Sequence, residues 1–254
     1  ETPADKTRPG EPPAERAPAE ERDDAAGRLY VVIDDVGYRT ENLEMFLELP
    51  FPVTYAVLPK LPGTADSVRK IEKAGFEYIL HQPMEPVGRE DPGPGAVYSK
   101  MDEKEVRRIV SENLKELPNA RGINNHMGSS ATAEEKVMEG VLGLAKEKGM
   151  FFLDSRTTSD TVAAKTAEGM ETDFTERNVF LDNESTEEYI RAALEEGVHI
   201  AGKQGYVVLI GHVWSEELYR VLEETGPVLQ EEGYSFHYIT DMFHRETASA
   251  GTGN

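Results

Sequence analysis

The sequence contains no cysteine. Disulfide bonds, thiolate nucleophiles and cysteine-based zinc sites are therefore excluded, and His, Asp and Glu remain as the strong metal ligands. No apolar run approaches the roughly 18 to 20 residues that a membrane helix needs, so we expect no transmembrane segment in this chain. Basic residues are also scarce, since 27 Lys and Arg stand against 48 Asp and Glu, for a formal charge of −21. Such a surface repels phosphate backbones, which argues against nucleic acid and for a neutral or cationic partner.

The two ends of the chain lack the apolar residues that a folded core requires. Residues 1–27 contain five prolines and no aromatic residue, so we expect a disordered linker there. Because the first residue is Glu1 rather than Met, we expect a processed or truncated form whose missing signal or anchor directs it to the periplasm or another extracytoplasmic site. A tail with no role fits this composition equally well. Residues 245–254 form a second short tail, which leaves 28–244 as the folded domain.

From Leu29 onward, short apolar runs alternate with longer charged segments of helical period. The expected strands cover 29–34, 53–58, 77–82, 122–127, 151–155, a weaker pair within 170–182, 206–212 and 235–240. The expected helices cover 64–74, 102–117, 133–147, 185–203 and 215–232. This alternation is typical of a parallel sheet covered by helices. Without a break in composition, it predicts either a single α/β barrel or a doubly wound sheet.

The predicted strands change character where they end. Each is apolar in its middle, and six of them end in titratable residues: Asp34 and Asp35, His81, His126, Asp154, Asp182, and His212. Parallel α/β folds assemble their functional sites at the carboxyl ends of the strands. We therefore expect these side chains to converge on one edge of the sheet.

The adjacent acids at the end of the first strand can take different roles. One of Asp34 and Asp35 can bind a metal while the other accepts a proton from water, although one of them could instead cap a helix. With either acid, His81 and His126 complete a two-histidine, one-carboxylate set. Such a set leaves positions open for water and substrate, as catalytic zinc requires, and other divalent metals also suit it.

Further residues near these strand ends complete the predicted site. His212 suits a general acid, because a carboxylate such as Asp154 beside a histidine raises the pKa of the imidazole. Arg156 is either part of the site or part of a salt bridge. Five residues are candidates for contacting substrate or orienting the ligands: Asn124, Asn125, Glu85, Asp182 and Trp214. A core position is an equally good explanation for the tryptophan.

Six motifs, in order, carry a family resemblance: "VVIDDVGYR", "LHQPMEP", "GINNHMGS", "FFLDSRT", "VFLDNE" and "LIGH". Over about residues 29–240, this pattern resembles the divergent polysaccharide deacetylase family, distant relatives of the carbohydrate esterases that remove N- or O-linked acetyl groups from polysaccharides. The resemblance implies a distorted (β/α) barrel of about seven strands and a metal-dependent hydrolytic site.

The family's residue roles transfer position by position. The resemblance implies that Asp34 is the catalytic base and Asp35 a metal ligand, with His212 as the catalytic histidine and Asp154 as the acid that tunes it. Arg156 would replace an arginine that the third family motif carries.

The second family motif holds two histidines four residues apart, and here the chain departs from it. His81 is present, but Glu85 stands in the second position. Either Glu85 or His126 is then the third ligand. We favour His126, because imidazole keeps the usual zinc chemistry and Pro83 opposes a helical pairing of residues 81 and 85.

The leading hypothesis is therefore a zinc-dependent hydrolase that acts on an acetylated polysaccharide. A carbohydrate- or envelope-binding protein that kept the barrel without turnover is the alternative, which the departure at Glu85 motivates. A non-haem iron oxygenase would use the same ligand set, but the alternation of strands and helices argues against that fold class.

Overall fold

The computed structural model describes residues 26–38 and 41–243. The predicted tail at 245–254, and all but the last two residues of the predicted linker at 1–27, lie outside the described residues. Within the described part, no helix has both the length and the apolar character needed to cross a bilayer.

A single sheet of nine strands forms the frame of the molecule, and every pairing in it is parallel. The strands are β1 (Gly27–Val36), β2 (Thr54–Val57), β3 (Glu77–Met84), β4 (Gly122–Met127), β5 (Phe151–Asp154), β6 (Phe174–Glu176), β7 (Val179–Phe180), β8 (Tyr206–His212) and β9 (Tyr234–His237). Their order is β6-β5-β4-β3-β2-β1-β8-β7, with β9 also paired to β1. This open (β/α) barrel confirms the predicted fold.

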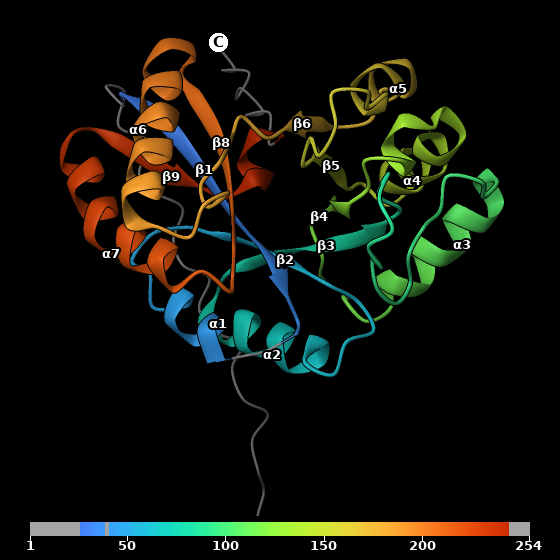
Figure 1. The fold of residues 1–254 in the computed structure, drawn as a ribbon, viewed down its shortest axis with the longest axis horizontal. Helices are drawn as coiled ribbons and strands as arrows, with labels where there is room; N and C mark the ends of the chain where they lie inside the picture. Colours follow the sequence, from blue (N-terminus) through green and yellow to red (C-terminus); the bar gives the residue numbers. More distant parts are fainter. Residues whose placement is uncertain (1–25, 39–40, 244–254) are drawn as a thin grey trace, which may run out of the picture.

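Seven helices lie around the outside of the sheet in the described residues (Figure 1). They are α1 (Glu41–Phe46), α2 (Thr64–Ala74), α3 (Glu103–Leu114), α4 (Glu135–Glu147), α5 (Ala163–Met170), α6 (Glu187–Gln204) and α7 (Glu216–Glu231). Side-chain caps fix several of their starts. Asp102 accepts the backbone N–H of Glu105 in a capping box, and Thr186 and Ser215 cap α6 and α7.

Two apolar clusters hold these layers together. The larger one fills the space between the sheet and the helices, and includes Ile33, Leu80 and Leu209. The smaller one contains the residues that alternate with them along the strands, such as Val32 and Ile210, and so fills the inside of the barrel. With both faces covered, the strands carry the continuous apolar runs seen in the sequence.

A short 3₁₀ helix, η2 (Ile239–Met242), closes the barrel at the amino ends of the strands. The strand expected at 235–240 ends at His237 instead, and the chain turns into this helix. The hydroxyl of Thr240 donates to the half-buried carboxylate of Glu77, the first residue of β3. Ile239 joins the inner cluster, so η2 acts as a plug.

The barrel is open between β6 and β7, the two ends of the strand order. Only Arg177 and Asn178 separate these strands along the chain. The backbone N–H of Arg177 donates to the backbone carbonyl of Asp154 in β5 (3.0 Å). That of Asn178 donates to the backbone carbonyl of Val208 in β8 (2.9 Å). The chain itself therefore spans the opening.

Candidate metal centre

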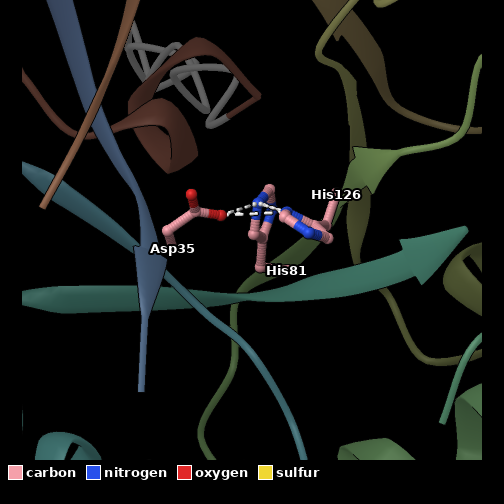
Figure 2. A group of neighbouring side chains, drawn as sticks. All are labelled: Asp35, His81 and His126. Carbon is pink, nitrogen blue, oxygen red and sulfur yellow. Dashed lines mark hydrogen bonds and ion pairs between the residues drawn. The ribbon is translucent and has the colours of Figure 1, made fainter. Parts of the chain in front are cut away.

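Asp35, His81 and His126 bring their polar atoms together at the carboxyl edge of the sheet. They come from β1, β3 and β4 and point toward one another (Figure 2). Oδ1 of Asp35 lies 3.3 Å from Nε2 of His81 and 2.9 Å from Nδ1 of His126, and the two nitrogens are 3.1 Å apart. Among the described residues, these three form the group of His and acidic side chains that could hold a metal ion.

The triangle of atoms has the dimensions of a metal site. Four ligands at zinc distances of about 2.0 Å would be about 3.3 Å from one another in a tetrahedron, close to the separations found here. Oδ1 of Asp35 is buried and accepts no aligned hydrogen bond from the described residues, although His126 is close. A buried oxygen without a donor is costly unless a cation compensates it. The three side chains therefore fit a divalent metal.

A buried asparagine sets the protonation of His81. Nδ1 of His81 lies 2.8 Å from Oδ1 of Asn124 and must donate to it, because a carboxamide oxygen only accepts. In a neutral ring this leaves the lone pair on Nε2, the atom that faces Asp35. A second partner of this kind fixes ring orientation in metal sites.

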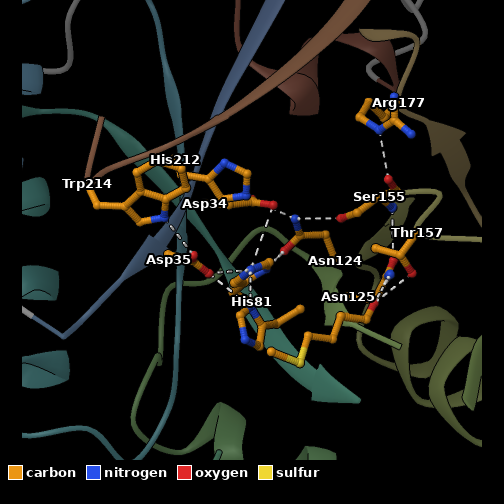
Figure 3. A network of polar contacts seen from close by, with 12 residues as sticks. Asp34, Asp35, His81, Asn124, Asn125, Ser155, Thr157, Arg177, His212 and Trp214 are labelled. Atoms are coloured by element: carbon orange, nitrogen blue, oxygen red, sulfur yellow. Dashed lines mark hydrogen bonds and ion pairs between the residues drawn. The ribbon is translucent and has the colours of Figure 1, made fainter. Parts of the chain in front are cut away.

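Asn124 also binds the other acid of the pair. Its Nδ2 donates to Oδ1 of Asp34 at 2.9 Å and lies 3.3 Å from Oγ of Ser155 (Figure 3). Asn124 is fully buried. The prediction that it contacts substrate is therefore wrong, whereas the alternative role of orienting a ligand agrees with its contacts.

Asn125 is likewise buried and points to the protein rather than to a cleft. Its Oδ1 accepts the backbone N–H of Ser155 (2.9 Å), and its Nδ2 donates to the carbonyl of Met127 (2.7 Å). A substrate contact is wrong for this residue too. It holds the loop after β5 against the end of β4.

Asp34 lies beside the cluster without joining it. It is buried, and its Oδ2 is 3.7 Å from Nε2 of His81. Burial raises the pKa of Asp34, and the nearby imidazoles of His81 and His212 offset this only in part. Burial acts the same way on Asp35, but there His126 and His81 prevail and hold its pKa below the ordinary value. The adjacent acids thus differ in their affinity for a proton.

The carboxylate that binds His212 is Asp182, and the expectation that Asp154 does so is wrong. Oδ1 of Asp182 lies 2.9 Å from Nδ1 of His212, and its Oδ2 accepts the backbone N–H of the same residue at 2.8 Å. Burial opposes protonation of His212, but the hydrogen bond and charge of Asp182 raise its pKa to about 9. Since Asp182 is buried and both its oxygens are engaged, a direct substrate contact is also wrong for it.

Asp154 instead shapes the loop that follows β5. Its carboxylate accepts the backbone N–H of Arg156 (2.8 Å) and the hydroxyl of Thr161 (2.7 Å). The side chain of Arg156 pairs with Glu176 at 2.8 Å, which is the salt-bridge alternative left open by the sequence. Neither residue contacts the metal cluster, so the structure gives no support to their predicted catalytic roles.

Arg177 is a residue near the site that the sequence did not single out. Its Nε and Nη2 donate to the carbonyls of Ser155 and Arg156 (2.8 and 2.9 Å). Its guanidinium lies 3.8 Å from the centre of the Phe180 ring, which in turn stacks on His212. Its position was hard to predict from the sequence, because Arg177 belongs to the two-residue connection between two very short strands.

Trp214 lies on the rim rather than in the core, and it is 50% exposed. Its ring stacks on His212 with centroids 5.0 Å apart, and its Nε1 donates to Oδ2 of Asp35 at 3.1 Å. The core alternative is therefore wrong for Trp214, and its contact with substrate stays a prediction.

Glu85 does not reach the cluster, so His126 rather than Glu85 joins Asp35 and His81. The carboxylate of Glu85 accepts the backbone N–H of Ser99 at 2.7 Å, and this bond lowers its pKa. Glu85 therefore secures the loop after β3 and is not a ligand in this arrangement, whereas a contact with substrate stays a prediction.

Three strand ends around the site have left-handed backbone conformations at residues other than glycine. These are Asp35 (φ 64°), Met127 (φ 54°) and Arg156 (φ 48°). Such conformations cost of order 1 kcal/mol or more and cluster at functional sites. At Asp35 the turn separates its side chain from that of Asp34, which explains why neighbouring acids have different partners.

Comparison with known proteins gives a family match. A family model described as divergent polysaccharide deacetylase matches residues 31–243. Two curated relatives are an uncharacterized protein YibQ of Escherichia coli (strain K12), 35% identical over 61% of this chain and 49% of that protein, and an uncharacterized protein of Haemophilus influenzae, 32% identical over 61% and 56%. The chain therefore spans about half the length of the curated relatives it matches.

Solved structures share the fold at low sequence identity. The uncharacterized protein ATU2773 from Agrobacterium tumefaciens C58 has a TM-score of 0.79 with 20% identity, covering 87% of this chain and 91% of that one. The catalytic domain of peptidoglycan N-acetylglucosamine deacetylase from Eubacterium rectale has a TM-score of 0.52 with 13% identity (86% and 90% covered). BA3943, a CE4 family pseudoenzyme from Bacillus anthracis, has a TM-score of 0.53 with 12% identity (85% and 64% covered). The fold is thus found in proteins described as an enzyme and as a pseudoenzyme.

Proposed function

The chain belongs to the divergent polysaccharide deacetylase family, and from this premise we propose that it is a metal-dependent hydrolase that removes acetyl groups from a polysaccharide. The observation that carries the proposal is the convergence of Asp35, His81 and His126 beside a separate buried acid, Asp34. A ligand set with a free acid next to it is what hydrolysis by an activated water requires.

Asp35, His81 and His126 would hold the ion, with zinc as the proposed metal. When bound, a divalent cation would polarise the acetyl carbonyl and ease deprotonation of the attacking water. Asn124 supports this binding by keeping the proton of His81 on Nδ1, away from the site.

The protein's own residues would move the protons. Asp34 accepts a proton from the attacking water as the water oxygen bonds to the acetyl carbon, and burial, which raises the pKa of Asp34, makes it a stronger base. His212, protonated up to about pH 9, donates a proton to the sugar nitrogen or oxygen as the acetyl bond breaks. Acetate and the free sugar amine or alcohol are then the products.

The test uses the zinc-loaded protein with acetylated chito-oligosaccharides, and measures released acetate together with bound metal. We expect acetate release by the natural protein. Asp34→Asn should keep its zinc and lose about 10²- to 10⁴-fold in rate, the usual contribution of a general base. Asp35→Ala and His126→Ala should lose zinc in elemental analysis.

Two results would contradict the proposal. Stoichiometric zinc in both Asp35→Ala and His126→Ala would refute the ligand set. Oligosaccharide binding at full zinc occupancy without acetate release would identify a carbohydrate-binding protein instead. Glu85→Gln is the matched control, because this carboxylate lies outside the cluster and should not change zinc content.

The proposed site of action is extracytoplasmic, where the cell's structural polysaccharides lie. The proline-rich composition of residues 1–27 supports this, because such a segment can act as a spacer from a membrane or wall. Fractionation of the native cells, with detection of the full-length chain, tests the location, and recovery in the cytoplasmic fraction would contradict it.

A further inference from the structure

The carboxylate of Asp35 is divided between two kinds of partner. Oδ1 faces His81 and His126, whereas Oδ2 accepts the 3.1 Å hydrogen bond from Nε1 of Trp214. Figure 3 shows the indole nitrogen pointing at Asp35 from the end of β8. Trp214 is the single tryptophan of the chain. Trp214 is thus the hydrogen-bond donor to Oδ2, the oxygen of Asp35 that does not face the histidines.

The indole is held in place from several directions. Its ring is nearly parallel to that of His212, at 17°, and the carbonyl of Trp214 accepts a hydrogen bond from Nδ2 of Asn42 at 3.3 Å. The next residue, Ser215, caps α7 by accepting the backbone N–H of Leu218. The indole therefore approaches Asp35 from a fixed position, although half of its surface is exposed to solvent.

An indole N–H has a chemistry that suits this position. It donates one hydrogen bond, has no lone pair to offer a metal and does not titrate. It can therefore hold a carboxylate oxygen without competing for the ion. A carboxylate can bind metals through one oxygen or through both, and the second mode uses a coordination position that catalytic zinc sites keep open.

From this geometry we infer that Trp214 is a positioning residue that restricts Asp35 to one metal-facing oxygen and thereby keeps a coordination position free for water and substrate. The inference rests on the proposed function, because it requires an ion at Asp35, His81 and His126. Loss of an outer partner of this kind typically weakens metal binding about 10- to 100-fold, and the same loss should raise the number of donor atoms around the ion.

The test removes the N–H and keeps the ring. Because Trp214 is the single tryptophan, growth of a tryptophan auxotroph on a benzothiophene analogue, in which sulfur replaces the N–H, changes this position alone. The metal-free proteins are titrated with Co²⁺, and affinity and visible absorption are recorded. We expect about 10- to 100-fold weaker binding and a lower absorption per bound Co²⁺, since four-coordinate cobalt absorbs more strongly than cobalt with more donors.

Trp214→Phe provides a second variant that keeps an aromatic ring on His212, and it should behave like the analogue. Tyr38→Phe is the control, because it alters another exposed aromatic residue after β1 and should keep the natural affinity and spectrum. Equal Co²⁺ affinity and equal absorption in the natural and the benzothiophene proteins would overturn the inference and leave the proposed function standing. Absence of Co²⁺ binding by the natural protein would overturn both.

Discussion

At the scale of single residues, the sheet edge brings together side chains that are far apart in the chain. The protonation of each histidine there depends on its hydrogen-bond partner. His81 is a buried imidazole of β3, and His212 is a partly buried imidazole at the end of β8. Asn124 directs the proton of His81 away from the cluster, whereas Asp182 keeps His212 protonated. One of them is thus prepared to bind a metal and the other to donate a proton.

Asp182→Asn tests the second of these roles. The substitution removes the charge that raises the pKa of His212 to about 9. His212 acts as an acid only while protonated, so activity should persist up to about pH 9 in the natural protein and be lost as pH rises further. In Asp182→Asn, the basic limb of kcat/KM against pH should move down by roughly 1 to 3 pH units.

A matched control for this measurement is Asp160→Asn, which removes an exposed carboxylate from the loop after β5. Its pH profile should equal that of the natural protein. A basic limb that stays in place in Asp182→Asn would show that His212 is not the acid, or that Asp182 does not set its pKa.

The sequence predicted the metal cluster better than its surroundings, for a physical reason. The carboxyl ends of parallel strands must lie at one edge, so the meeting of His81, His126 and one of the two acids was predictable without knowing which strands are neighbours. The choice of Asp35 over Asp34 came from the family resemblance. The partner of His212 was not predictable, because it depends on strand order. β7 pairs with β8 and β5 does not, which places Asp182 rather than Asp154 beside that histidine.

At the scale of elements, the strands and the longer helices were predictable from their apolar patterns, and the two shortest helices were not. α2 begins and ends at the expected residues 64 and 74. α1 and α5, with 6 and 8 residues, are too short to show a helical repeat of apolar residues. η2 was mistaken for the end of a strand, because its contacts with the first residues of β2 and β3 are not encoded locally.

The hydrogen bonds of η2 to Thr54 and Glu77 lead to a prediction about stability. In Thr240→Val, the half-buried Glu77 loses a hydrogen-bond donor, and the free energy of unfolding should fall by about 1 to 3 kcal/mol. Urea denaturation measures this, and the dependence of that free energy on urea concentration should not change.

The loss should also depend on pH. Burial raises the pKa of Glu77 above its ordinary value of 4.5, although Thr240 and Thr54 oppose the shift. The stability from Glu77 is therefore full below pH 4.5 and decreases as pH rises through the raised pKa. Thr240→Val raises that pKa further, so the variant should lose more stability at neutral pH than at pH 4. In a Glu77→Gln background the loss should be the same at both pH values, and a pH-dependent loss there would contradict this explanation.

At the scale of the whole molecule, the chain of 254 residues carries a large excess of negative charge. A net charge of −21 makes the folded chain repel itself, because a compact shape brings like charges closer together than an unfolded one. Salt screens this repulsion over about 10 Å at 0.1 M. We therefore expect Tm in scanning calorimetry to rise as NaCl increases from 10 to 300 mM, by about 2 to 8 °C for a gain of one or two kcal/mol.

Choline chloride, which supplies the same ionic strength with a different cation, is the control, and it should give the same rise. A Tm that stays constant or falls in both salts would mean that the ion pairs of the helices outweigh the general repulsion. A rise with NaCl alone would indicate specific sodium binding instead.

The opening between β6 and β7 gives the barrel one side that can change in width. Elsewhere the circumference is fixed by rows of interstrand hydrogen bonds, but here its length is set by the two covalently linked residues, Arg177 and Asn178. Insertions in this segment would move β7, and with it Asp182, relative to β5, while β1, β3 and β4 kept their mutual register. Relatives could thus vary the spacing between the loop after β5 and Asp182 through changes in one segment, while His212 stays paired with Asp34 across β8 and β1.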